Sequence, residues 1–190
     1  MNMAHLSFND EDMLAGLKPW VLCESPSYDP AAVNRMQDIV AHDLAVMGAS
    51  IERISSHSSI GDCIRARFAH PQYDQPGLLI VGHMDTVHPL GTLTELPFKR
   101  DGNHCYGPGI CDMKGGNYLA LEAIRQLQRA GLETPLPITV LFTSDEEIGS
   151  PYTRALIEAE AARAKVVLLP EPARKGNGVT SGRYAVARYD

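Results

Sequence analysis

Apolar and polar positions along the chain follow two different rhythms. In four stretches, apolar residues recur every three or four positions, as on the buried face of an amphipathic helix. Five shorter runs are apolar or alternating, as in strands. The pattern predicts helices over residues 12–22, 30–47, 113–130 and 152–164. It predicts strands over residues 51–55, 63–68, 78–81, 138–142 and 166–169.

Cap and stop residues mark the ends of these predicted helices. Asp29-Pro30 is typical of an N-cap followed by a proline in the first turn. Gly48 and Gly131 follow the second and third helices, where a glycine commonly ends a helix. Helices that alternate with strands favour an α/β fold, with helices on both faces of one sheet. The length of 190 residues suits one good-sized domain.

Three predicted strands end in residues that can bind a metal ion. They are followed by Gly82-His83-Met84-Asp85, by Thr143-Ser144-Asp145-Glu146-Glu147, and by Pro170-Glu171-Pro172. A glycine-rich loop over residues 107–116 adds Asp112. Open α/β sheets bind their ligands at the carboxyl ends of strands. His83 and Asp85 can share a face there, which suits an imidazole held by a carboxylate while its other nitrogen binds metal.

Each cluster taken alone has a simpler interpretation. A His-x-Asp after a strand is often an ordinary loop, and 145–147 alone would be a solvated acidic turn or a helix N-terminus. The glycine-rich loop suggests phosphate binding, but it lacks the P-loop arrangement because Met113 precedes Lys114. Cys111, beside Asp112, is a candidate soft ligand. Ligand residues at three strand ends together favour a metal centre.

In their order and combination, GHMDTV, YGPGICDMKGG, TSDEEIGS and PEP resemble the motifs of a known family. They are similar to those of the dinuclear zinc amidohydrolases of the M20 metallopeptidase family, and most of all to its glutamate carboxypeptidase (carboxypeptidase G2-like) members. The resemblance runs from Ser25-Pro26-Ser27 to Thr180-Ser181-Gly182. It implies a mostly parallel-sheet catalytic domain and a cis peptide bond between Asp112 and Met113.

The resemblance also implies which residues bind metal. His83 and Glu171 would bind one zinc ion, Asp112 would bridge two, and Glu147 would bind the second. In the family, the other protein ligand of the second zinc is a histidine from a later part of the chain. Zinc accepts imidazole nitrogen and carboxylate oxygen, and cobalt or manganese are alternatives to it.

Two further residues take catalytic roles by the same resemblance. Asp85 would orient His83, and Glu146 would be the general base. A carboxylate beside an activated water can take its proton and pass it to the leaving amine. Paired zinc ions activate water near neutral pH, so the residue types suit this chemistry.

The implied function is zinc-dependent hydrolysis of an amide bond, as in a carboxypeptidase that releases C-terminal glutamate or a similar amino acid. One alternative is an N-acyl amino acid deacylase of the acetylornithine deacetylase or succinyl-diaminopimelate desuccinylase type. Another is a catalytically silent metal-binding fragment of a larger enzyme. The substrate would be a small peptide or an N-acyl amino acid.

The resemblance further predicts how the chain divides. Residues 1–182 would form the N-terminal portion of the catalytic domain, truncated before the lid or dimerisation domain. Residues 183–190 would start the first strand of that missing domain. Homodimers are expected only with the lid domain present.

Composition narrows the partners and the location. A net charge of −6 without a basic stripe argues against nucleic acid. No run approaches the ~18 apolar residues that a membrane span needs, and the N-terminus has no signal-peptide pattern. Cys23, Cys63, Cys105 and Cys111 form no CxxC pair. Reduced thiols in a cytoplasmic protein are therefore expected.

Overall fold

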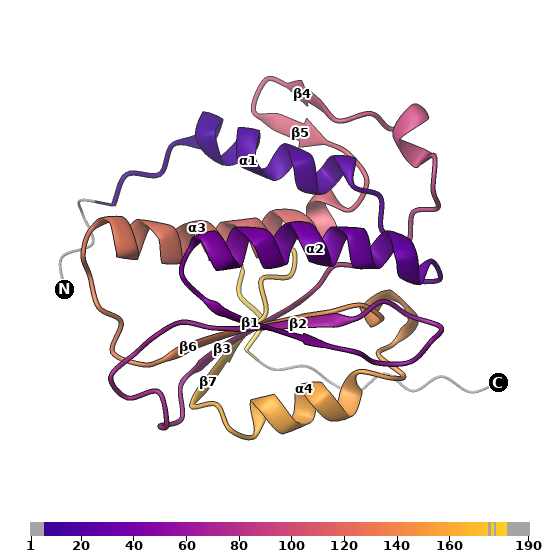
Figure 1. The fold of residues 1–190 in the computed structure, drawn as a ribbon. Coiled ribbons are helices and arrows are strands. Elements are labelled where there is room, and N and C mark those ends of the chain that lie inside the picture. Colours follow the sequence, from indigo (N-terminus) through magenta and orange to yellow (C-terminus); the bar gives the residue numbers. More distant parts are fainter. Residues whose placement is uncertain (1–5, 175, 177, 182–190) are drawn as a thin grey trace.

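The computed structural model describes residues 6–174, 176 and 178–181, and in this part the chain forms a three-layered domain (Figure 1). A five-stranded sheet lies between helices. Helices α1 (Asp10–Leu22), α2 (Pro30–Val46) and α3 (Gly115–Arg129) cover one face, and α4 (Arg154–Ala161) covers the other. The strands are β1 (Ser50–Ile54), β2 (Cys63–Arg67), β3 (Leu78–His83), β6 (Ile138–Thr143) and β7 (Val166–Leu168). The predicted α/β class, with helices on both faces, is confirmed.

The sheet has the strand order β1-β2-β6-β3-β7. Strand β3 pairs in parallel with both β6 and β7, whereas β2 is antiparallel to β1 and to β6. Hence β1 points the same way as β6, and β2 alone runs against the others. The sheet is therefore mixed: four of its five strands point the same way, and two of its four pairings are parallel. The carboxyl ends of β3, β6 and β7 therefore lie along one edge.

The core fills the space between the sheet and its three-helix layer. Trp20 of α1 packs edge-to-face on Tyr118 of α3 and on Phe142 of β6, with ring centroids 5.3 and 6.4 Å apart. Such aromatic pairs stabilise a core beyond the area that they bury. A smaller apolar cluster lies under α4, around Leu79 and Leu141. Strands β3 and β6 are covered on both faces, which explains their continuous apolar runs.

Local signals place most helix ends within two residues of the prediction. Asp29 caps α2 by accepting a hydrogen bond from the Ala32 amide at 2.9 Å, and the helix ends before Gly48. Helix α1 begins two residues early because the Asn9 side chain caps it. Helix α3 begins two residues late because the backbone at Asp112 and Met113 is not helical. Helix α4 is shorter than predicted at both ends.

Some elements were not predicted at all. The hairpin β4 (Lys99–Asp101) and β5 (His104–Tyr106) lies beyond α1 from the sheet, and two short 3-10 helices cover Thr92–Thr94 and Glu146–Ile148. Polar residues dominate the hairpin and its side chains are largely exposed, so it carries no apolar rhythm. The strand predicted over residues 183–190 lies outside the described residues. Within the described part, no helix is both long and apolar enough to cross a membrane.

Strand β3 and helix α3 approach so closely at Gly82 that a side chain does not fit. A Cβ atom at Gly82 would lie 2.0 Å from Oδ1 of Asn117, whose Nδ2 donates a hydrogen bond to the His83 carbonyl at 2.8 Å. We predict that Gly82→Ala lowers the free energy of unfolding by about 1–3 kcal/mol, the usual cost of overpacking. Denaturant unfolding followed by circular dichroism measures it.

The double variant Gly82→Ala/Asn117→Ala is the control for this cause. Removing the Asn117 side chain frees the space, so the double variant should lose less stability than the sum of the two single variants. Strictly additive losses would contradict a clash between these two residues.

Candidate metal centre

Parallel pairing brings two of the predicted ligand segments together. His83, the last residue of β3, pairs with Thr143, the last residue of β6, and the Met84 amide donates to the Thr143 carbonyl at 3.0 Å. The segments that follow, with Asp85 and Glu147, therefore leave the sheet side by side. His83 lies inside the strand and not after it, since β3 runs two residues longer than predicted.

The His83 ring is oriented by a main-chain carbonyl. Its side chain is buried, and Nδ1 lies 2.9 Å from the carbonyl oxygen of Asp85. A carbonyl only accepts hydrogen bonds, so Nδ1 carries the proton and Nε2 is left to bind a metal. The Asp85 carboxylate is farther from Nδ1, at 3.4 Å. Asp85 was expected to orient His83. In the structure the main-chain carbonyl of Asp85 lies closer to Nδ1 of His83 than the Asp85 carboxylate does.

Four carboxylates surround the free nitrogen of His83. Ligand atoms of His83, Asp112 and Glu147 all lie within 4.8 Å of one another. Nε2 of His83 is 3.2 Å from Oδ1 of Asp112. It is 3.7 Å from Oε2 of Glu146 and 3.9 Å from Oε1 of Glu171. The structure thus brings together the residues predicted from three strand ends and one loop.

The carboxylate of Asp85 connects these segments. It is fully buried and accepts a hydrogen bond from the Ser27 hydroxyl at 2.6 Å. It also accepts from the backbone amides of Glu146 and Glu147, both at 3.2 Å. Ser27 was not predicted as a site residue, although it stands in the Ser25-Pro26-Ser27 motif. Asp85 therefore fixes the turn that carries both glutamates.

Asp112 and Glu171 are held by the loop before α3 and by its first turn. The peptide bond between Asp112 and Met113 is cis, as the family resemblance implies. A Cβ atom at Gly116 would lie 1.7 Å from the carbonyl oxygen of Pro170. Only glycine permits this approach, which sets the residue before Glu171 against the start of α3.

Asp145 has a structural role that the sequence did not reveal. Its buried carboxylate accepts hydrogen bonds from the amides of Tyr152 and Thr153, at 2.9 and 3.1 Å, and from the Thr153 hydroxyl. It thus satisfies amides just ahead of α4, whose own N-cap side chain makes no capping bond. Asp145 anchors the 145–149 turn and does not join the cluster around His83.

The charges in the cluster perturb one another. Burial alone would lower the pKa of His83, but hydrogen bonding and the charges of Asp85 and Glu146 raise it to about 9. Burial and the neighbouring carboxylates raise the pKa of Glu147 to about 7. Burial likewise raises the pKa of Glu171, with the charges of Asp112 and Glu146 adding to the effect. Carboxylates gathered in this way favour a bound cation, which would relieve their repulsion.

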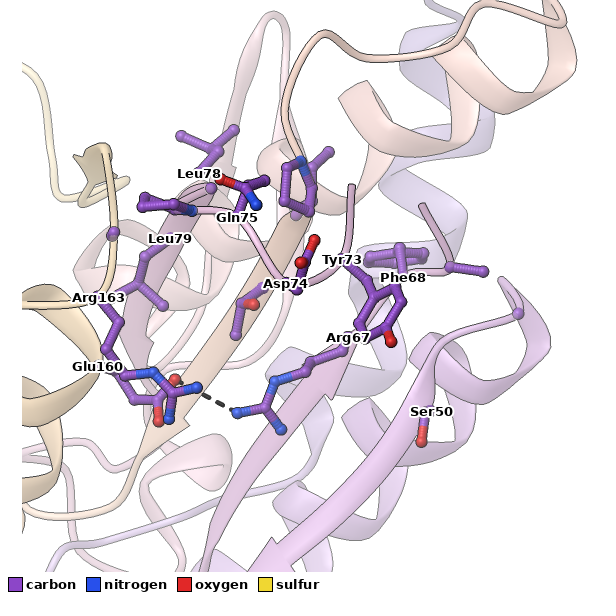
Figure 2. A pocket seen from close by; sticks show the side chains of 18 residues that line it. Ser50, Arg67, Phe68, Tyr73, Asp74, Gln75, Leu78, Leu79, Glu160 and Arg163 are labelled. Carbon is purple, nitrogen blue, oxygen red and sulfur yellow. Dashed lines mark ion pairs between the residues drawn. The ribbon is translucent and has the colours of Figure 1, made fainter. Parts of the chain in front are cut away.

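The cluster opens onto a cavity of about 800 Å³. Asp112, Glu146 and Glu171 contribute to its wall, as does Leu169. A second cavity, of about 540 Å³, lies where β3 and β6 begin, at the other end of the sheet (Figure 2). There the Arg67 guanidinium faces Glu160 at 3.6 Å. This second cavity contains none of the six predicted site residues.

A sequence profile of the peptidase family M20/M25/M40 matches residues 79–188, more than half of the chain. The chain belongs to this peptidase family. The resemblance inferred from the motifs is thereby confirmed. Membership of this metallopeptidase family implies a metal cofactor, and His83, Asp112 and Glu147 form a group that fits one.

Two curated relatives illustrate the range of the family. Carboxypeptidase G2 of Pseudomonas sp. (strain RS-16) is 46% identical over 100 residues, which cover 53% of this chain and 24% of that protein. Acetylornithine deacetylase of Salmonella paratyphi B (strain ATCC BAA-1250 / SPB7) is 39% identical over 100 residues, covering 50% and 25%. The matched segment spans about a quarter of each relative.

Solved structures share the fold of this chain. Human carnosine dipeptidase 1 superimposes with a TM-score of 0.74 at 20% identity, over 86% of this chain and 39% of that one. An M20 family metallo-carboxypeptidase from Sulfolobus solfataricus gives 0.71 at 19% identity, over 87% and 38%. At these identities the likeness concerns the fold alone.

We predict that His83→Ala removes high-affinity metal binding, because no other imidazole lies in the cluster among the described residues. The loss should exceed the about 10–100-fold typical of a residue that only supports a ligand, which we expect for Asp85→Ala. Isothermal titration calorimetry with zinc measures both. His104→Ala, on the exposed β5, is the matched control and should bind zinc normally. Unchanged affinity in His83→Ala would contradict the assignment.

Proposed function

We propose that the protein is a zinc-dependent hydrolase of amide bonds that releases a C-terminal amino acid such as glutamate. The observation that carries the proposal is the convergence of one imidazole and four carboxylates, of which Asp112, Glu146 and Glu171 line a cavity of about 800 Å³. The 46% identity with carboxypeptidase G2, over 53% of this chain, supports the choice of reaction.

The donor set suits zinc. A metal ion would displace the proton from Nε2 of His83, whose ring is held through Nδ1 by the Asp85 carbonyl, and Asp112 would add carboxylate oxygens. In the proposed arrangement, Glu171 would join His83 in holding one zinc ion, and Glu147 would hold the other. By the family resemblance, a further histidine would complete the second ion.

Bound zinc would supply Lewis-acid activation of the scissile carbonyl and of water at neutral pH. The chain's own residues supply proton transfer and position. Glu146 reaches the cavity wall, where its carboxylate can take a proton from water and deliver it to the leaving amine nitrogen. Asp85 holds the Glu146 amide, so the base keeps its place relative to His83.

Deacylation of an N-acyl amino acid is the second candidate. The 39% identity with acetylornithine deacetylase favours it, and the same residues would cleave either amide. Parallel assays of the whole protein on an N-acyl glutamate and on N-acetylornithine separate the two. Faster turnover of N-acetylornithine would replace the carboxypeptidase proposal with the deacylase.

Metal content tests the proposal independently of the substrate. Two zinc ions per protein with amide hydrolysis would support it. One zinc ion without turnover would contradict it and support a catalytically silent metal-binding protein, and no zinc without turnover would contradict both.

We predict opposite effects for the two neighbouring glutamates. Glu146→Gln should keep zinc and the fold but lose about 10²–10⁴-fold in turnover, the usual effect of removing a general base. Glu147→Gln should lose zinc, because its carboxylate belongs to the ligand group. Zinc content and turnover are measured on the same samples, with Glu158→Gln on exposed α4 as control. The reverse result would mean that base and ligand are exchanged.

A further inference from the structure

Lys114 is a buried cation that the proposed chemistry does not use. It lies two residues after Asp112, directly before α3, and only 1% of its surface is exposed. Among the described residues, no carboxylate oxygen lies within 4.0 Å of the Lys114 amine, the distance expected for an ion pair. Burying a charge is costly unless it is hydrogen-bonded, so its partners indicate what it does.

Those partners are two carbonyl groups at the end of α1. Nζ of Lys114 donates to the Trp20 carbonyl at 3.0 Å and to the Cys23 carbonyl at 2.7 Å. The last turn of α1 contains no basic residue of its own. Carbonyls at a helix C-terminus lack helical partners and carry partial negative charge, so a cation there is favourable. Lys114 therefore attaches the loop of Asp112 to the C-terminus of α1.

The chain that leaves α1 then contacts the turn after His83. The Ser25 hydroxyl donates to the Met84 carbonyl at 2.6 Å, and the Thr86 amide donates to the Ser25 carbonyl at 2.8 Å. Ser27 donates to the Asp85 carboxylate. Residues 20–27 thus lie between the turn after His83 and the loop of Asp112, hydrogen-bonded to both.

We propose that Lys114 is a positioning residue for Asp112, which uses residues 20–27 to set the Asp112 loop against the turn after His83. The inference rests on the proposed metal site. The physical reason is that metal ligands must be held within about 0.5 Å by their supporting contacts. The Asp112 side chain, 54% exposed, has little packing of its own to hold it.

The first test removes the amine. Lys114→Met keeps a straight apolar side chain and should weaken zinc binding of the whole protein by about 10–100-fold. In the metal-free protein, hydrogen exchange over residues 107–116 should become faster, because the amides of Lys114 and Gly115 bond within this loop. Glu122→Gln is the matched control, since Glu122 is a buried charge of α3 that pairs with Arg125. It should lower stability and leave both readouts unchanged.

The second test acts from the other end of the segment. Ser25→Ala removes only the hydroxyl that donates to the Met84 carbonyl. This is a much smaller change than Lys114→Met, so Ser25→Ala tests the inference even if Lys114→Met does not fold. Ser25→Ala should also speed hydrogen exchange over residues 107–116, although the substituted residue lies outside that segment. The double variant Lys114→Met/Ser25→Ala should lose less zinc affinity than the sum of the losses in the two single variants, because both substitutions act through residues 20–27.

The outcomes separate this inference from the proposed function. If the unsubstituted protein takes up no zinc, the proposed function fails, and the positioning role fails with it. If it takes up zinc and Lys114→Met binds equally well, only the role of Lys114 fails. Unchanged exchange over residues 107–116 in Ser25→Ala would likewise overturn it.

Discussion

The buried carboxylate of Asp85 is the interaction on which the rest of the site depends. A buried charge is tolerated only when hydrogen bonds replace water, and here the donors come from distant parts of the chain. Ser27 supplies one, and the amides of Glu146 and Glu147 supply two. These donors can be satisfied together only when the ends of β3 and β6 and the segment before α2 are all in place. The solvation of one anion thereby fixes the backbone that carries both glutamates.

The sequence predicts the sheet and its ligand-bearing edge because both depend on strong local patterns. Continuous apolar runs reveal β3 and β6, and the rule that parallel strands share a carboxyl edge brings His83 and Glu147 together. The supporting residues depend instead on long-range partners. Nothing near Lys114 in the sequence indicates that its amine reaches the end of α1, and the polar hairpin β4–β5 has no apolar rhythm to reveal it.

Three neighbouring acids show why residue type alone does not assign a role. Asp145 is fully buried and satisfies amides ahead of α4. Glu146 lines the cavity, and Glu147 joins the ligand group. Their surroundings differ because the short 3-10 turn, held from outside by Asp85, points successive side chains in different directions. The sequence identifies the acidic segment, but only the three-dimensional contacts distinguish the roles of its three acidic residues.

The parallel register of β3 with β6 and β7 also has a consequence for folding kinetics. A crossover connection separates each pair of parallel neighbours in the sequence. Each pairing therefore costs the entropy of closing a long loop before the contacts between the strands stabilise it. Non-local pairings of this kind form slowly. On a ribosome, His83 emerges well before Glu147 and Glu171, and alone it is a weak ligand. Metal capture would therefore follow assembly of the sheet, and would stabilise the finished domain without guiding its early folding.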